Sequence, residues 1–251
     1  MSAVNGRGSQ AVGRLVGVGL GPGDPELLTV KAVRLIAEAP VIAYFAKNGR
    51  PSNARRIADR WIKVGVIEMP LLYPVTTEIP FDEPAYSRAL RPFYDKSAKA
   101  IAAHLDAERD VALICEGDPL FYGSFMHIHA RLKDRFEVTI CAGVTGMSGC
   151  WTAAQAPMSW GDDVLTVLPG TLPRDDLARR LAATDAAVVM KLGHNLPKVR
   201  AALADAGLAE RAIYVERGTM AEERILPLAD KTDDDAPYFA LILVPGRGRR
   251  P

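Results

Sequence analysis

The chain has 251 residues, of which 49% are hydrophobic and 24% are charged, ordinary values for a soluble globular protein. This length suits one large domain or two domains of roughly 100–150 residues each. The formal net charge is +1. The overall charge balance therefore gives no electrostatic argument for a nucleic-acid partner or for an anionic membrane surface.

The cysteines and the N-terminal segment indicate the cellular compartment. Cys115, Cys141 and Cys150 are odd in number and lack a CxxC spacing, so we expect neither a disulfide framework nor a zinc site. No apolar run approaches the ~20 residues that span a bilayer. Residues 1–12 lack the apolar centre of a signal peptide and are typical of a disordered tail. We expect a cytoplasmic protein with neither a membrane nor a nucleic-acid partner.

In the first half of the chain, short apolar runs alternate with segments of helical periodicity. The predicted strands are Leu15–Val18, Val41–Phe45, Asp110–Cys115 and Phe136–Cys141; the predicted helices are Pro25–Glu38, Asn53–Trp61, Tyr86–Leu105, a segment ending near Lys133, and Gly146–Gln155. Apart from its one helix, the stretch 48–84 is predicted to be loop-rich, because it contains Gly49 and five prolines.

The same alternation restarts after Pro157. The predicted strands are Val164–Leu168, Ala186–Lys191, Ala212–Glu216, Arg224–Pro227 and Tyr238–Val244, with helices at Arg174–Ala183 and Leu196–Ala206. Alternation in both halves predicts α/β architecture. We place the domain boundary near Pro157–Gly161, which gives an N-terminal α/β domain over 13–158 and a C-terminal α/β domain over 159–247.

The first glycine-rich segment, VGVGLGPGDPELLT, follows the first predicted strand. The dinucleotide fingerprint needs a glycine at its sixth position, where counting from Gly17 or Gly19 gives Pro22 or Asp24. The P-loop also fails, because no Lys-Ser or Lys-Thr pair follows the glycines.

Asp24 is suited to cap the next helix, with Pro25 as the first helical residue. A helix N-terminus that already has a carboxylate offers little to a phosphate. Gly21-Pro22-Gly23 predicts a rigid turn with accessible backbone. We therefore expect this loop to permit close approach of a ligand without binding its charge.

Two further turns of small residues follow strands. Glu116–Gly123 repeats the order of glycine, capping Asp and Pro, and Ala142–Gly149 is a third such turn. Each turn taken singly is also a common cap. Three at the carboxyl ends of strands favour a crevice where α/β proteins bind ligands.

The segments VGVGLGPGDPELLT, CEGDPLFYGS, CAGVTGMSG, VVMKLG, VERGTM and YFALILVPG resemble the tetrapyrrole methylase family, in family order and over nearly the whole chain. The resemblance implies two α/β domains of the tetrapyrrole methylase type with the active-site cleft between them. It also implies a homodimer, a tetrapyrrole substrate and the methyl donor S-adenosyl-L-methionine (SAM). Within the family, MPLLYPVTTE, EGDPLFYGSF and ERGTMAEER look like the branch that methylates carbon 20 of a corrin precursor.

The resemblance also implies the residues that hold the cofactor. Pro22 would lie near the ligand cleft, and Glu116, Gly117 and Asp118 would meet the methionine and ribose portions. The others would flank the cofactor or hold its adenine through backbone atoms: Thr145, Gly146, Leu192, Gly218 and Ala240.

Methyl transfer from a sulfonium needs alignment more than it needs a nucleophilic side chain. A proton must still leave the methylated carbon, and Tyr73, Glu78 and Glu116 are the candidate acceptors. Basic residues that could pair with substrate carboxylates are Lys47, Arg50, Arg55 and Arg91. We expect no metal site, because His127 and His129 are two positions apart and face different sides of a helix.

Two other possibilities stay open. The first is a family member that acts on a cobalt-bearing substrate or on another ring carbon. The second belongs to a different class, a non-catalytic module that binds SAM or a tetrapyrrole.

Overall fold

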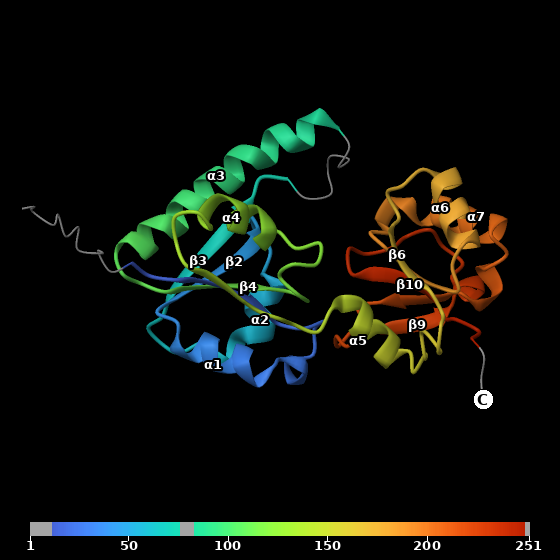
Figure 1. Ribbon diagram of the computed structural model, residues 1–251, viewed down its shortest axis with the longest axis horizontal. Helices are drawn as coiled ribbons and strands as arrows, with labels where there is room; N and C mark the ends of the chain where they lie inside the picture. Colours follow the sequence, from blue (N-terminus) through green and yellow to red (C-terminus); the bar gives the residue numbers. More distant parts are fainter. Residues whose placement is uncertain (1–11, 76–82, 249–251) are drawn as a thin grey trace, which may run out of the picture. The chain divides into compact units, whose positions relative to one another are not determined.

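The computed structural model describes residues 12–75 and 83–248 (Figure 1). The contacts form two units, the first made of residues 12–21 and 25–144 and the second of residues 22–24 and 145–248. Each unit combines one five-stranded sheet with helices, which confirms the predicted α/β class. This grouping places Gly146–Ala153 with the second sheet, and the domain boundary near Pro157–Gly161 stays a prediction.

The first unit is built on a parallel sheet with the strand order β3-β2-β4-β1-β5. Every residue of β1 and β4 is buried, as in parallel sheets that are covered on both faces. Figure 1 shows α3 and α4 on one face and α1 and α2 on the other, and each pair covers its own hydrophobic cluster. The elements are β1 (Leu15–Gly19), α1 (Val30–Glu38), β2 (Val41–Lys47), α2 (Asn53–Ala58), β3 (Ile67–Tyr73), α3 (Pro84–Asp106), β4 (Val111–Cys115), α4 (Phe125–Leu132) and β5 (Val138–Cys141), with 3-10 turns at Pro25–Leu27 and Asp59–Trp61.

Strand β3 corrects the prediction that residues 48–84 are loops apart from one helix. It pairs with β2 over its whole length, Val41 opposite Ile67 through Lys47 opposite Tyr73. Pro70 lies in the middle of β3, and in the sequence this proline was interpreted as a sign of a loop. Proline lacks an N–H and is tolerated at a sheet edge, and β3 is an edge strand.

The two predicted Asp-Pro helix caps are wrong. Pro25–Leu27 forms a single 3-10 turn, and α1 begins at Val30 after Thr29, whose side chain accepts a hydrogen bond from the Ala32 amide at 3.1 Å. Helix α4 begins at Phe125, well beyond Asp118. In both loops the chain makes additional turns before its helix starts, so neither aspartate lies at the N-terminus of that helix.

The second unit has a mixed sheet with the order β6-β7-β10-β8-β9, in which only the β6–β7 pairing is parallel. Strand β10 is buried throughout and lies at its centre. The elements are α5 (Gly146–Ala153), β6 (Leu165–Pro169), α6 (Arg174–Ala182), β7 (Ala186–Met190), α7 (Leu196–Asp205), β8 (Ile213–Glu216), β9 (Arg224–Pro227) and β10 (Ala240–Val244), with 3-10 turns at Gly193–Asn195, Ala209–Arg211 and Leu228–Asp230. Among the helices of both described segments, none has the length and hydropathy needed to cross a bilayer.

Candidate functional site

The three glycine-containing loops follow strands of the first unit that are neighbours in its sheet. Strands β4, β1 and β5 are parallel and adjacent, so the loops after them emerge at one edge. The Gly117 amide donates to the Gly21 carbonyl at 2.8 Å, and the Gly21 amide donates to the Gly117 carbonyl at 3.3 Å. An antiparallel backbone bridge between the two loops therefore follows the parallel pairing of β1 with β4.

The close approach predicted for these loops is made in part by the protein itself. A methyl group at Gly143 would lie 2.1 Å from the Gly117 carbonyl oxygen, and one at Gly19 would lie 2.6 Å from the Gly143 nitrogen. Gly117 has a φ of +65°, a conformation that favours glycine. These glycines are thus required by contacts between loops, whether or not a ligand also approaches them.

Asp118 joins the second loop to the third. One carboxylate oxygen accepts from the Leu120 amide at 2.9 Å, and the other accepts from the Gly143 amide at 3.0 Å. Both oxygens therefore position backbone. Contact of Asp118 with a cofactor stays a prediction.

Glu116 joins the second loop to α2. Its Oε1 accepts from the Ala54 amide at 3.1 Å, in the first turn of that helix. Burial raises the pKa of the Glu116 carboxyl above its ordinary value. The side chain is thus a partly desolvated carboxylate that supports a neighbouring helix.

In the second unit, the Pro22–Asp24 segment of the first loop packs tightly. A methyl group at Gly149 would lie 2.4 Å from the Pro22 Cβ, and the Asp24 amide donates to Thr219 Oγ1 at 3.2 Å. Gly21, whose amide and carbonyl are paired, and Pro22 are both buried. The prediction of a turn with accessible backbone is therefore wrong for these two positions.

Helix α5 begins at the third loop. Thr145 is its N-cap, and the Thr145 hydroxyl accepts from the Ser148 amide at 3.3 Å. A methyl group at Gly146 would meet no atom within 4 Å. The first turn of α5 therefore leaves room beside Gly146.

Three residues with left-handed backbone border two of the three remaining predicted cofactor positions. Lys191 has a φ of +57°, Arg217 of +51° and Thr219 of +69°. Such conformations cost free energy in residues with side chains and concentrate at functional sites. They flank Leu192 and Gly218 on the chain.

The side chains at these positions belong to the core. Leu192 is fully buried, Ala240 is 6% exposed, and a methyl group at Gly218 would lie 2.7 Å from the Cys150 sulfur. Burial raises the pKa of the Cys150 thiol to about 12. Any ligand contact by Leu192, Gly218 or Ala240 must therefore use backbone, which is how the family resemblance assigns them.

Two of the three candidate proton acceptors are described. Tyr73 ends β3 and Glu116 follows β4, with β2 between those strands in the sheet; Glu78 lies outside the described residues. The Tyr73 hydroxyl donates to Ser124 Oγ at 2.5 Å, and Ser124 Oγ also hydrogen-bonds the Tyr94 hydroxyl at 3.0 Å. Three hydroxyl groups thus form one network within the first unit.

The predicted basic residues separate into two groups. Lys47, Arg50 and Arg55 line one hollow of the first unit, whereas Arg91 is exposed on α3 and does not line it. In the described part of the chain, no group of three or more His, Cys, Asp and Glu side chains could hold a metal ion. His127 stacks on Tyr94 with ring centroids 4.2 Å apart.

Sequence reasoning missed three polar residues of these surroundings. Ser124 binds two tyrosines, Thr219 binds the Asp24 amide, and Arg56 lines the basic hollow. Of these three, only Arg56 could have been identified from the sequence, because it is adjacent to the candidate Arg55. The other two are recognised by partners that are distant in sequence.

Two α/β units, with glycine loops at the carboxyl edge of a parallel sheet, are the architecture that the family resemblance implies. The sequence model of the tetrapyrrole (corrin/porphyrin) methylase family matches residues 14–231, so the chain belongs to this family. It is 58% identical over 240 residues to the precorrin-2 C(20)-methyltransferase of Sinorhizobium sp, covering 96% of this chain and 98% of that protein.

Two further similarities are informative. The cobalt-precorrin-2 C(20)-methyltransferase of Salmonella typhimurium is 26% identical over 235 residues, covering 92% of this chain and 96% of that protein. The crystal structure of uroporphyrin-III C-methyltransferase from Thermus thermophilus, complexed with S-adenyl homocysteine, is 25% identical with a TM-score of 0.61; the match covers 92% of this chain and 96% of that one.

Proposed function

We propose that this protein transfers a methyl group from SAM to carbon 20 of precorrin-2, giving precorrin-3A during synthesis of the corrin ring of cobalamin. The observation that carries the proposal is the 58% identity, over nearly the full length of both chains, to a relative of that name. The relative named for the cobalt-bearing substrate is only 26% identical. This difference favours the metal-free substrate.

The proposed cofactor residues are Glu116, Gly117 and Asp118 in the first unit and Pro22, Thr145, Gly146, Leu192, Gly218 and Ala240 in the second. Their surroundings fit a cofactor held by backbone: there is room beside Gly146, and the buried side chains of Leu192 and Ala240 leave only their peptide groups for contact. The complex of the Thermus relative with S-adenyl homocysteine supports the choice of cofactor.

When bound, SAM supplies an electrophilic methyl group on a sulfonium. In the transfer, a bond forms between carbon 20 and the methyl carbon as the sulfur–methyl bond breaks, and the carbon-20 proton then leaves. The chain must hold the two reacting atoms about 3–3.5 Å apart and exclude water. Loops joined by the Gly21–Gly117 pairing and by Asp118 are suited to this, because rigid backbone loses little freedom on binding.

The proton from carbon 20 needs an acceptor, and Tyr73, Glu78 and Glu116 remain the proposed candidates. The raised pKa makes Glu116 a stronger base than an ordinary carboxylate. Tyr73 could pass a proton through the Ser124 hydroxyl with which it is hydrogen-bonded.

The test is to incubate the purified protein with methyl-labelled SAM and either precorrin-2 or its cobalt complex. We expect label in the metal-free tetrapyrrole. Label only in the cobalt complex would show that this complex, and not precorrin-2, is the substrate. SAM binding detected by calorimetry without any methyl transfer would indicate a non-catalytic binding module. The homodimer and the cytoplasmic location stay predictions; sedimentation analysis and cell fractionation test them.

A further inference from the structure

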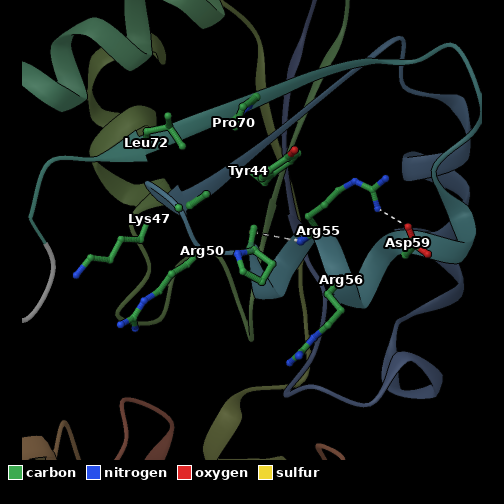
Figure 2. Close-up of a pocket in the computed structure, with 12 residues that line it drawn as sticks. Tyr44, Lys47, Arg50, Arg55, Arg56, Asp59, Pro70 and Leu72 are labelled. Atoms are coloured by element: carbon green, nitrogen blue, oxygen red, sulfur yellow. Dashed lines mark hydrogen bonds and ion pairs between the residues drawn. The ribbon is translucent and has the colours of Figure 1, made fainter.

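A hollow of about 570 Å³ lies beside the ends of β2 and β3 and the start of α2, all within the first unit (Figure 2). Its size is within the ~300–1,000 Å³ range of small-molecule sites. One wall is apolar, with Pro70 and the half-exposed Leu72 from β3. The other wall carries Lys47, Arg50, Arg55 and Arg56.

Arg55 is committed to the protein. Its guanidinium donates to both carboxylate oxygens of Glu68, at 2.5 and 3.0 Å, and to Asp59 at 2.6 Å. These bonds hold the pKa of the Glu68 carboxyl below its ordinary value. Arg55 therefore fixes α2 against β3 and has little capacity left for a ligand carboxylate.

Arg50 and Arg56 are placed differently. Both are exposed, and neither has a carboxylate partner within the described residues; Arg56 donates only to the Asn53 side chain, at 3.1 Å. In Figure 2 both extend away from the Arg55–Asp59 pair. The four cationic side chains of this wall outnumber the two carboxylates beside them, Asp59 and Glu68, so these groups together carry a net positive charge.

The hollow is mechanically linked to the proposed cofactor loop. Glu116, at the start of that loop, accepts the amide hydrogen bond of Ala54 in the first turn of α2. The turn that carries Arg50 is closed by the Arg50 amide donating to the Lys47 carbonyl at 3.0 Å. Arg56 thus lies on a helix that is hydrogen-bonded to the loop after β4, and Arg50 lies on a turn that is closed by its own segment.

We infer that this hollow is a carboxylate-binding subsite for the acidic side chains of the tetrapyrrole, with Arg50 and Arg56 as the pairing groups and Arg55 as a structural residue. The inference rests on the proposed function. Planar guanidinium groups bind carboxylates in a forked geometry, and the apolar wall fits the hydrocarbon part of such a side chain. Arg50 and Arg56 would then determine substrate affinity without contacting the methyl donor.

The experiment measures binding of uroporphyrin III, a stable porphyrin polycarboxylate, by fluorescence titration to the full-length protein. For Arg50→Ala and Arg56→Ala we expect dissociation constants raised about 3- to 10-fold each, with a larger effect in the double variant and a weaker salt dependence. Arg180→Ala is the matched control, since Arg180 is an exposed arginine of α6 in the other unit. SAM affinity and kcat of the double variant should match the unmodified protein, while its KM for precorrin-2 should rise.

Porphyrin binding unchanged within twofold in the double variant would overturn the subsite, even if the unmodified protein methylates precorrin-2. An equal loss in Arg180→Ala would overturn it too, because the effect would then reflect overall charge. If the unmodified protein fails to methylate precorrin-2 but the arginine variants lose porphyrin binding, the proposed function fails and the carboxylate site stands.

Discussion

The contact between the loops after β1, β4 and β5 makes a sharp prediction for Gly143→Ala. The added Cβ would lie 2.1 Å from the Gly117 carbonyl oxygen and 2.8 Å from the Gly19 Cα. Both neighbours are backbone atoms, so neither can rotate aside as a side chain would. The loops must separate by about 1 Å, which in a close-packed interior costs typically 1–3 kcal/mol.

Gly146→Ala is the matched control, three residues along the same segment. A methyl group there meets no protein atom within 4 Å, and Gly146 is the first residue of α5. Stability should be unchanged or slightly raised, because alanine favours a helix more than glycine does.

Urea unfolding and thermal unfolding, both followed by circular dichroism, measure the difference. A loss of 1–3 kcal/mol corresponds to a melting temperature lower by roughly 2–4 °C per kcal/mol for a chain of this size. The two units need not unfold together, so each transition is compared separately. If Gly143→Ala unfolds like the unmodified protein, the argument that these loops are limited by backbone contact is refuted. SAM calorimetry adds a second result, since Gly146→Ala should weaken SAM binding at full stability if that residue contacts the cofactor.

Three other predictions concern titrating and hydrogen-bonded groups. Burial raises the pKa of Glu116, so the stability from its protonated form is full below the unfolded-state pKa of 4.5 and is lost as pH rises through the folded-state pKa. The stability of Glu116→Gln relative to the unmodified protein should therefore increase as pH rises from the unfolded-state pKa of 4.5 through the folded-state pKa; a pH-independent difference would contradict this. The pKa of Glu68 is lowered by Arg55, so Glu68→Gln should cost at most ~1 kcal/mol at neutral pH, and the cost should diminish as pH falls below the unfolded-state pKa of 4.5 and through the lower folded-state pKa; a cost that does not change with pH would argue against the ion pair. If Tyr73 accepts the proton and passes it through Ser124, then Tyr73→Phe and Ser124→Ala should both lower kcat and alter the pH–rate profile, with SAM affinity unchanged; an unchanged profile in Tyr73→Phe would exclude Tyr73, and one in Ser124→Ala would exclude Ser124.

Patterns between near neighbours in the chain predicted the alternation of strands and helices. The apolar run Leu15–Val18 is the buried strand β1, and the motif order identified the family before any geometry was available. These signals are local, because hydrophobic periodicity and turn composition act over a few residues. Two predictions from these signals were wrong: Asp24 does not cap α1, and β3, which contains Pro70, was predicted to be a loop.

The roles of particular side chains were decided by tertiary structure. Glu116 accepts from Ala54, 62 positions away, Asp118 from Gly143, 25 positions away, and Arg55 is bound by Glu68, 13 positions away. The local sequence around a carboxylate does not indicate which distant amide or guanidinium will donate a hydrogen bond to it. Folding brings those groups together, and buried polar groups must find a partner. The sequence therefore determined the family and the strands that carry the loops, while the fold decided which of the polar residues were already committed to the protein itself.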